Sequence, residues 1–120
     1  MRRYPETGAA TAYAASIAVL LTTAALVVTQ VAGLVRLKHS VAAAADLSAL
    51  AASRASVNGE EACDAATAIA RRNGARVLTC RMDFDVATVT ARGTSRTWWG
   101  HRWAFEQKAR AAPNFYLSGK

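Results

Sequence analysis

The residues best suited to metal binding or thiol chemistry in this sequence are two cysteines and two histidines. They are Cys63, Cys80, His39 and His101. Four such side chains match the ligand number of a structural zinc site, but none of the usual short ligand spacings is present. The two cysteines both follow a long apolar stretch and predict one disulfide if that region lies in an oxidising compartment. The alternative is a pair of buried free thiols that act as small apolar side chains.

Motifs of the common enzyme classes are missing from the sequence. It contains no glycine-rich phosphate loop after a predicted strand, no HExxH, no serine nucleophile elbow and no CxxC. Asp83 and Asp85 lie two residues apart in a predicted turn, where aspartates more often shape the turn than bind a metal. The sequence therefore predicts a protein that is not an enzyme and that binds no cofactor.

Basic and aromatic residues are concentrated near the C-terminal end, and the whole chain carries a formal net charge of +7. The candidates for contact with a polyanion are Arg96, Trp98, Trp99, Arg102 and Arg110. Arginine neutralises phosphates and indole rings stack on bases, so this group suits DNA or another anionic polymer. Two alternatives stay open. One is contact with lipid headgroups, and the other is a strand whose exposed basic edge discourages strand addition.

An uncharged, apolar stretch separates Glu6 from Arg36. As a helix, these roughly 30 residues would rise about 44 Å, which exceeds a hydrocarbon core of about 30 Å. We therefore expect a basic leader over residues 1–7 and a transmembrane helix over residues 8–36. The arginines of the leader favour a cytoplasmic N-terminus and an extracytoplasmic head. Basic residues also follow the span, and they favour the opposite orientation. The alternative is a cleaved secretory signal, although the apolar run is longer than the core of such signals.

Residues 37–57 contain no glycine or proline and are rich in alanine, so the helix is predicted to continue through them. With the span they would form a helix of roughly 50 residues, about 75 Å long. The residues expected to line its packing face are Leu37, Val41, Ala44, Ala45, Leu47, Ser48 and Leu50. Because a small head offers too little surface to cover so long a helix, we expect partner helices to cover this face. The alternative is a helix that lies across its own head.

The rest of the chain is predicted to form a small α+β head over residues 58–113. Asn-Gly pairs are typical of helix ends, and segments rich in valine and threonine favour strands. The expected elements are a helix over residues 60–72, antiparallel strands over residues 75–82, 86–91 and 102–111, and a loose tail over residues 114–120.

Side-chain alternation along the first expected strand would place Leu78, Cys80 and Met82 on one face. Cys63 belongs to the apolar face of the preceding helix and would therefore oppose Cys80. A disulfide that closes a loop of this size raises the free energy of the unfolded state by about 3 kcal/mol, because the unfolded chain loses conformational entropy. Such a crosslink would matter in a head this small.

Several runs of the sequence together resemble TadE/TadG-like proteins of Tad (tight adherence, Flp-type) pilus systems. The runs are Gly8–Thr11, Ser40–Ala52, Cys63, Asn73–Ala75, Cys80 and Ala109–Pro113. The set covers most of the chain and is most similar to the small actinobacterial TadE-like proteins. The resemblance implies a minor pilin or pseudopilin with one membrane-anchored helix that packs among other pilin helices, and with a small head on the outer face.

The resemblance also implies partners and processing. The partners would be other pilins or pseudopilins and a Tad-type membrane platform, and the protein would lie in the cell membrane or in a surface filament. A prepilin peptidase would cut between Gly8 and Ala9. Tyr13 departs from the pattern, because many type IV pilins carry at this position a glutamate that assists assembly.

Two functions follow as expectations. The first is a structural minor pilin or pseudopilin-like component of a Tad-type apparatus that acts through helix–helix packing. The alternative is a membrane-tethered binding module whose basic and aromatic C-terminal part binds DNA or another anionic polymer.

Overall fold

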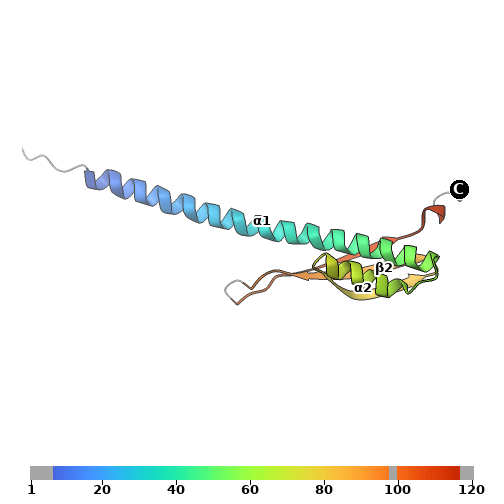
Figure 1. The fold of residues 1–120 in the computed structure, drawn as a ribbon. Coiled ribbons are helices and arrows are strands. Elements are labelled where there is room, and N and C mark those ends of the chain that lie inside the picture. The colour runs from blue at the N-terminus through green and yellow to red at the C-terminus, as the bar shows by residue number, and fades with distance from the viewer. Residues whose placement is uncertain (1–6, 98–99, 117–120) are drawn as a thin grey trace, which may run out of the picture. The chain divides into compact units, whose positions relative to one another are not determined.

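The chain forms two helices and one antiparallel sheet, which confirms the expected α+β class (Figure 1). The computed structural model describes residues 7–97 and 100–116. The elements are α1 (Thr7–Val57), α2 (Ala62–Arg72), β1 (Arg76–Asp83), β2 (Val86–Thr94), β3 (Ala104–Ala111) and a 3-10 turn, η1 (Asn114–Tyr116). The turn η1 occupies the start of the expected loose tail. The expected leader up to Glu6 and the tail beyond Tyr116 lie outside the described residues.

The first of two compact units covers Met1–Gly33 and contains the first half of α1. Among the described residues, α1 is the one helix long and apolar enough to cross a membrane, and none of its most apolar window is buried. Four hydroxyls in this half donate hydrogen bonds to the carbonyl four residues earlier, each at 2.8 Å. They belong to Ser16, Thr22, Thr23 and Thr29. These hydroxyl donors are therefore satisfied within the helix and need no hydrogen bond to water. A helix surrounded by lipid must meet this condition.

The second unit covers Leu34–Lys120 and includes the second half of α1. The expected head began at residue 58, whereas this compact unit begins at Leu34. A head made only of α2 and three strands would leave much of one sheet face open to water. The second half of α1 covers that face, so we call Leu34–Lys120 the head from here on.

Both helices end where Asn-Gly pairs predict. Gly59 and Gly74 have φ values of 75° and 71°, in the left-handed region that glycine adopts without a steric penalty. Glu60 N donates to the Ala55 carbonyl at 2.8 Å, which satisfies one of the last carbonyls of α1. The start of α2 at Ala62 lies two residues after the expected start at residue 60.

The three strands form an antiparallel sheet in the order β1-β2-β3. The observed β2 is three residues longer than expected, and β3 starts two residues later. The register shifts between Val77 and Thr79, so Leu78 is the extra residue of a bulge. The expectation that Leu78 shares a face with Cys80 and Met82 is therefore wrong. Val77 packs against the core with them, and Leu78 is exposed.

The core of the head is built almost entirely from small side chains. Its buried residues are Val41, Ala44, Ala45, Ser48, Ala49, Ala52, Ser53 and Ala55 of α1, Ala66 and Ala70 of α2, Ala75 just before β1, then Ala87, Val89 and Ala91 of β2, and Ala109 of β3. Val89 and Ser48 are its largest fully buried side chains. Small side chains let helix and sheet backbones approach closely, but they bury little apolar area, so other stabilisation matters in this head.

Candidate functional site

The two cysteines form a disulfide that joins α2 to β1, as one of the two sequence interpretations predicted. The Cys63 and Cys80 sulfurs are bonded, and their Cα atoms lie 5.8 Å apart. Neither thiol is therefore available to a metal. Among the described residues, no group of three or more His, Cys, Asp or Glu side chains could hold a metal ion. His101 instead makes an edge contact with Trp103, with ring centroids 6.0 Å apart.

The residues expected to pack against partner helices divide into two groups. Val41, Ala44, Ala45 and Ser48 are at most 2% exposed because they fill the core of the head itself. The expectation that these four contact partner helices is therefore wrong, and the alternative of a helix lying across its own head describes them. Leu37 is half-buried. Leu47 and Leu50 point away from the core and are 48% and 47% exposed.

Leu47 and Leu50 belong to an exposed stripe on α1, which we call the outward stripe. It consists of Ala43, Leu47, Leu50, Arg54 and Val57, and its spacing alternates between four and three residues. This is the spacing that presents side chains along one seam to a neighbouring helix. The stripe was only partly recognisable from sequence, because the alanine-rich run has small residues on every face of the helix.

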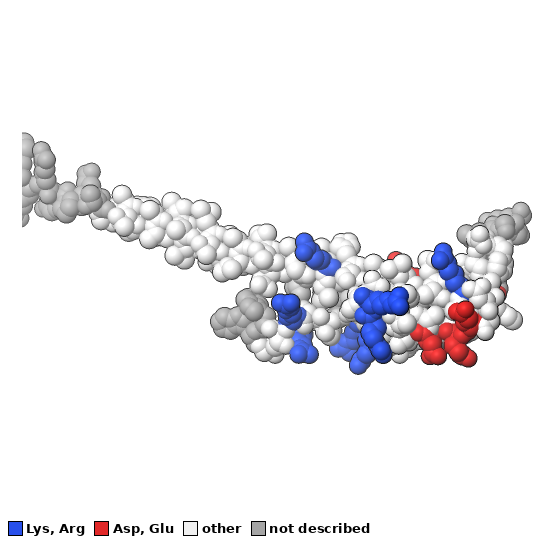
Figure 2. All heavy atoms as spheres, viewed as in Figure 1, with Lys and Arg blue, Asp and Glu red and all other residues white. Residues whose placement is uncertain are grey.

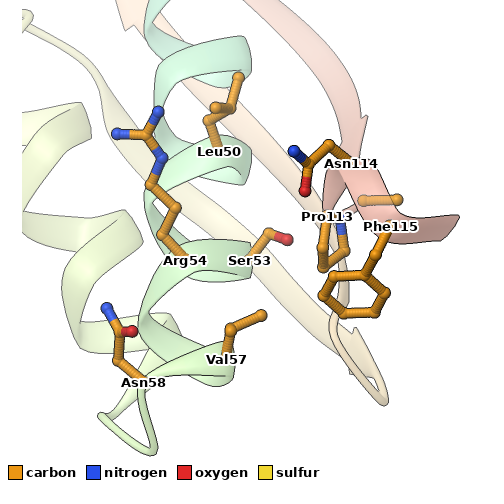
Figure 3. A pocket seen from close by; sticks show the side chains of 9 residues that line it. Leu50, Ser53, Arg54, Val57, Asn58, Pro113, Asn114 and Phe115 are labelled. Atoms are coloured by element: carbon orange, nitrogen blue, oxygen red, sulfur yellow. The ribbon is translucent and has the colours of Figure 1, made fainter. Parts of the chain in front are cut away.

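Beside the outward stripe lies a groove of about 600 Å³ in the head. Leu50, Ser53 and Val57 of α1 line one wall, and Pro113 and Phe115, which follow β3, line the other (Figure 3). Arg54 also lines it. Its lining is mostly apolar, and it lies at the end of the head where α1 stops. Sequence reasoning missed this groove, because its two walls come from segments that are far apart in the chain.

The β1–β2 hairpin presents an aromatic side chain at the same end of the head. Phe84 occupies the turn with φ 57° and is 91% exposed. Ser53 Oγ donates to the Asp85 carbonyl at 2.8 Å, and Ser56 Oγ donates to Asp85 Oδ1 at 2.8 Å. These two serines of α1 hold the turn in place. The sequence predicted the tight connection, but not the exposed ring.

The three arginines proposed for polyanion contact are not brought together. Arg96 and Arg102 lie between β2 and β3, where Arg102 Nε donates to Thr97 Oγ1 at 2.7 Å. Arg110 lies near the other end of β3, opposite Thr88. Trp98 and Trp99 lie outside the described residues. The three arginines of the expected cluster are therefore divided between the two ends of the sheet.

Basic residues do gather on the sheet face that points away from the core. Arg76 of β1 stands directly opposite Arg92 of β2, and Glu106 of β3 stands opposite Arg92 on its other side. Lys108 and Arg110 of β3 stand opposite Thr90 and Thr88. Arg92 Nε is buried without a hydrogen-bond partner among the described residues. On the face seen in Figure 2, basic side chains are spread along the head, and acidic ones gather at one end.

The proposed cleavage position lies at the start of α1. Gly8 and Ala9 are both exposed there, and a side chain at Gly8 would meet no neighbour within 4 Å. Tyr13 is exposed one turn further on. Comparison of the chain with protein-family models, with curated proteins and with solved structures finds no match.

Proposed function

We propose that this protein is a structural, non-enzymatic component of a TadE-like pilus or secretion apparatus that acts through helix–helix packing. The observation that carries the proposal is the outward stripe. Leu47, Leu50 and Val57 each remain about half exposed on a helix whose opposite face is filled by the head. Apolar side chains repeated at this spacing and left in water favour association with another helix.

The first half of α1 supports membrane anchoring in this proposal. It is apolar, it is unburied, and its hydroxyls are satisfied within the helix. Within a bilayer, close packing of small side chains drives helix association, and alanine and threonine are frequent in this half. Partners would then contact the protein through this half and through the outward stripe.

The Cys63–Cys80 disulfide supports an extracytoplasmic head and a cytoplasmic N-terminus, because disulfides persist in oxidising compartments. Cleavage between Gly8 and Ala9 belongs to the same proposal. Intact-mass measurement of protein recovered from membranes tests this part. The proposal predicts a chain that begins at Ala9, and a chain that retains Met1 would contradict the processing step.

Co-isolation from membranes tests the packing function. A tagged full-length chain should recover single-span partners in mild detergent, and Leu47→Asn combined with Leu50→Asn should remove them. Ala68→Asn is the matched control, because Ala68 is exposed on α2 and should leave recovery unchanged. Partners that survive the double substitution, or none with the unmodified chain, would contradict the proposal.

A second candidate function is polyanion binding, now through the outer sheet face rather than the expected cluster. Arg76, Lys108 and Arg110 share this face with Arg92, which stands opposite Arg76 on one side and opposite Glu106 on the other. The basic residues outnumber this one acid, and an anion would neutralise the excess charge. Binding of duplex DNA should then weaken steeply with salt, and Arg76→Gln with Arg92→Gln should reduce both affinity and the salt slope. Arg96→Gln is the control. An equal effect of that control would contradict the outer-face site.

A further inference from the structure

We propose that two copies of this protein pair through the end of the head, with Phe84 of each copy seated in the groove of the other. The pairing goes beyond the proposed pilus function. Its groove shares Leu50, Arg54 and Val57 with the outward stripe, but its anchor, Phe84, lies outside that stripe, and the pairing does not use the apolar half of α1. It concerns the end of the head where α1 stops, which carries both the exposed ring of Phe84 and the apolar groove.

Phe84 has the properties of an anchor residue. It is the most exposed of the large apolar side chains in the described residues. Its positive φ is uncommon for a bulky residue and costs free energy that asparagine or glycine would avoid at this position. The hydrogen bonds from Ser53 and Ser56 to Asp85 keep the turn in this conformation. Buried aromatic anchors of this kind dominate many protein–protein contacts.

The groove suits a phenyl ring. Leu50, Val57 and Pro113 provide apolar walls, and the volume of about 600 Å³ exceeds that of one aromatic side chain (Figure 3). Ser53 lines the groove and also bonds the hairpin turn. Ring and groove therefore belong to one patch of the head. A patch that carries both complementary parts can meet a copy of itself across a two-fold axis, which closes the assembly at two copies.

The charged residues around the Phe84 ring and around the groove favour the same pairing. Asp83 and Asp85 flank the ring, and Arg54 lines the groove. Asp83 Oδ1 forms an ion pair with Arg81 Nη2 at 3.2 Å. Because the Asp83 side chain is 46% exposed, its carboxylate can accept a second donor. When Phe84 enters the groove of the other copy, the acidic flanks would approach Arg54. Two such contacts would bury less than a standard interface of about 1,600 Å², so we expect weak, concentration-dependent pairing.

Directed crosslinking of full-length chains in lipid vesicles tests the pairing. Copies with Phe84→Cys are mixed with differently tagged copies that carry Val57→Cys, with the native disulfide intact. We expect a mixed-tag disulfide product under mild oxidation. The matched control replaces Val57→Cys by Ala68→Cys, an exposed position on α2. A product no more abundant than in this control would overturn the proposal.

Substitutions separate pairing from folding. Phe84→Gly should raise the melting temperature of the head slightly or leave it unchanged, and should weaken pairing at least about tenfold. Phe84→Leu should retain part of the pairing. Arg54→Glu should weaken it, and adding Asp83→Lys to the same chain should restore it. Pairing that is unchanged in Phe84→Gly, or a charge exchange that restores nothing, would overturn the proposal.

Discussion

Gly93 of β2 faces Val41 of α1 so closely that a methyl group on Gly93 would overlap Cγ2 of Val41. This contact joins α1 to β2 within the head. Val41 is branched at Cβ and has little freedom to move aside. The pair therefore determines how closely α1 approaches the sheet, and both residues are buried.

Gly93→Ala should destabilise the head by about 1–3 kcal/mol, because the new methyl group overpacks this contact. Combining it with Val41→Ala should restore part of the loss, since the smaller side chain makes room. Urea unfolding in detergent, followed by pulse proteolysis, measures both variants. Strictly additive losses would show that the two residues are not in contact.

Ala45 and Ala43 provide a second comparison on the same helix. Ala45 is fully buried, so Ala45→Leu should destabilise the head by about 1–3 kcal/mol through overpacking. Ala43 is exposed on the outward stripe, and Ala43→Leu should change stability by less than about 0.5 kcal/mol. The same unfolding assay applies. Equal losses for the two variants would contradict the assignment of the two faces of α1.

Ser48 and Ser53 should respond in opposite directions to alanine. Ser48 Oγ is buried without a hydrogen-bond partner among the described residues, so Ser48→Ala should leave stability unchanged or raise it by up to about 1 kcal/mol. Ser53→Ala removes the donor to the Asp85 carbonyl and should cost about 1–2 kcal/mol. A comparison of the urea unfolding midpoints of the two variants tests this prediction. An increase in stability for Ser53→Ala would contradict it.

Loss of the Cys63–Cys80 disulfide should lower the free energy of unfolding by about 3 kcal/mol, because a loop of 17 residues is released in the unfolded chain. We expect the double variant Cys63→Ala/Cys80→Ala to match the reduced native protein. Non-reducing mass spectrometry confirms the redox state of each sample. A variant as stable as the oxidised protein would show that the core alone holds α2 in place.

Local signals in the sequence were sufficient for most element boundaries. Asn58-Gly59 and Asn73-Gly74 predicted both helix ends. Such signals act through the conformation of a few adjacent residues. They are therefore visible without knowledge of the tertiary structure.

The features that the sequence did not predict correctly depend on contacts between segments that are far apart in the chain. Alanine occurs on every side of α1 after residue 40, so its pattern could not show which face the sheet would cover. The bulge at Leu78 reverses the alternation of β1 through its pairing with β2, and no local signal marks it. The groove between Val57 and Pro113 likewise exists only once β3 lies beside α1.

Photo-crosslinking in native membranes tests the proposed packing function most directly. A photoreactive residue at Leu47, on the outward stripe, is compared with one at Thr67, which is exposed on α2. The account predicts that Leu47 crosslinks the membrane-embedded protein to the helix of a neighbouring single-span protein, and that Thr67 does not. No product at Leu47, or recovery of the unmodified chain outside the membrane, would contradict the account.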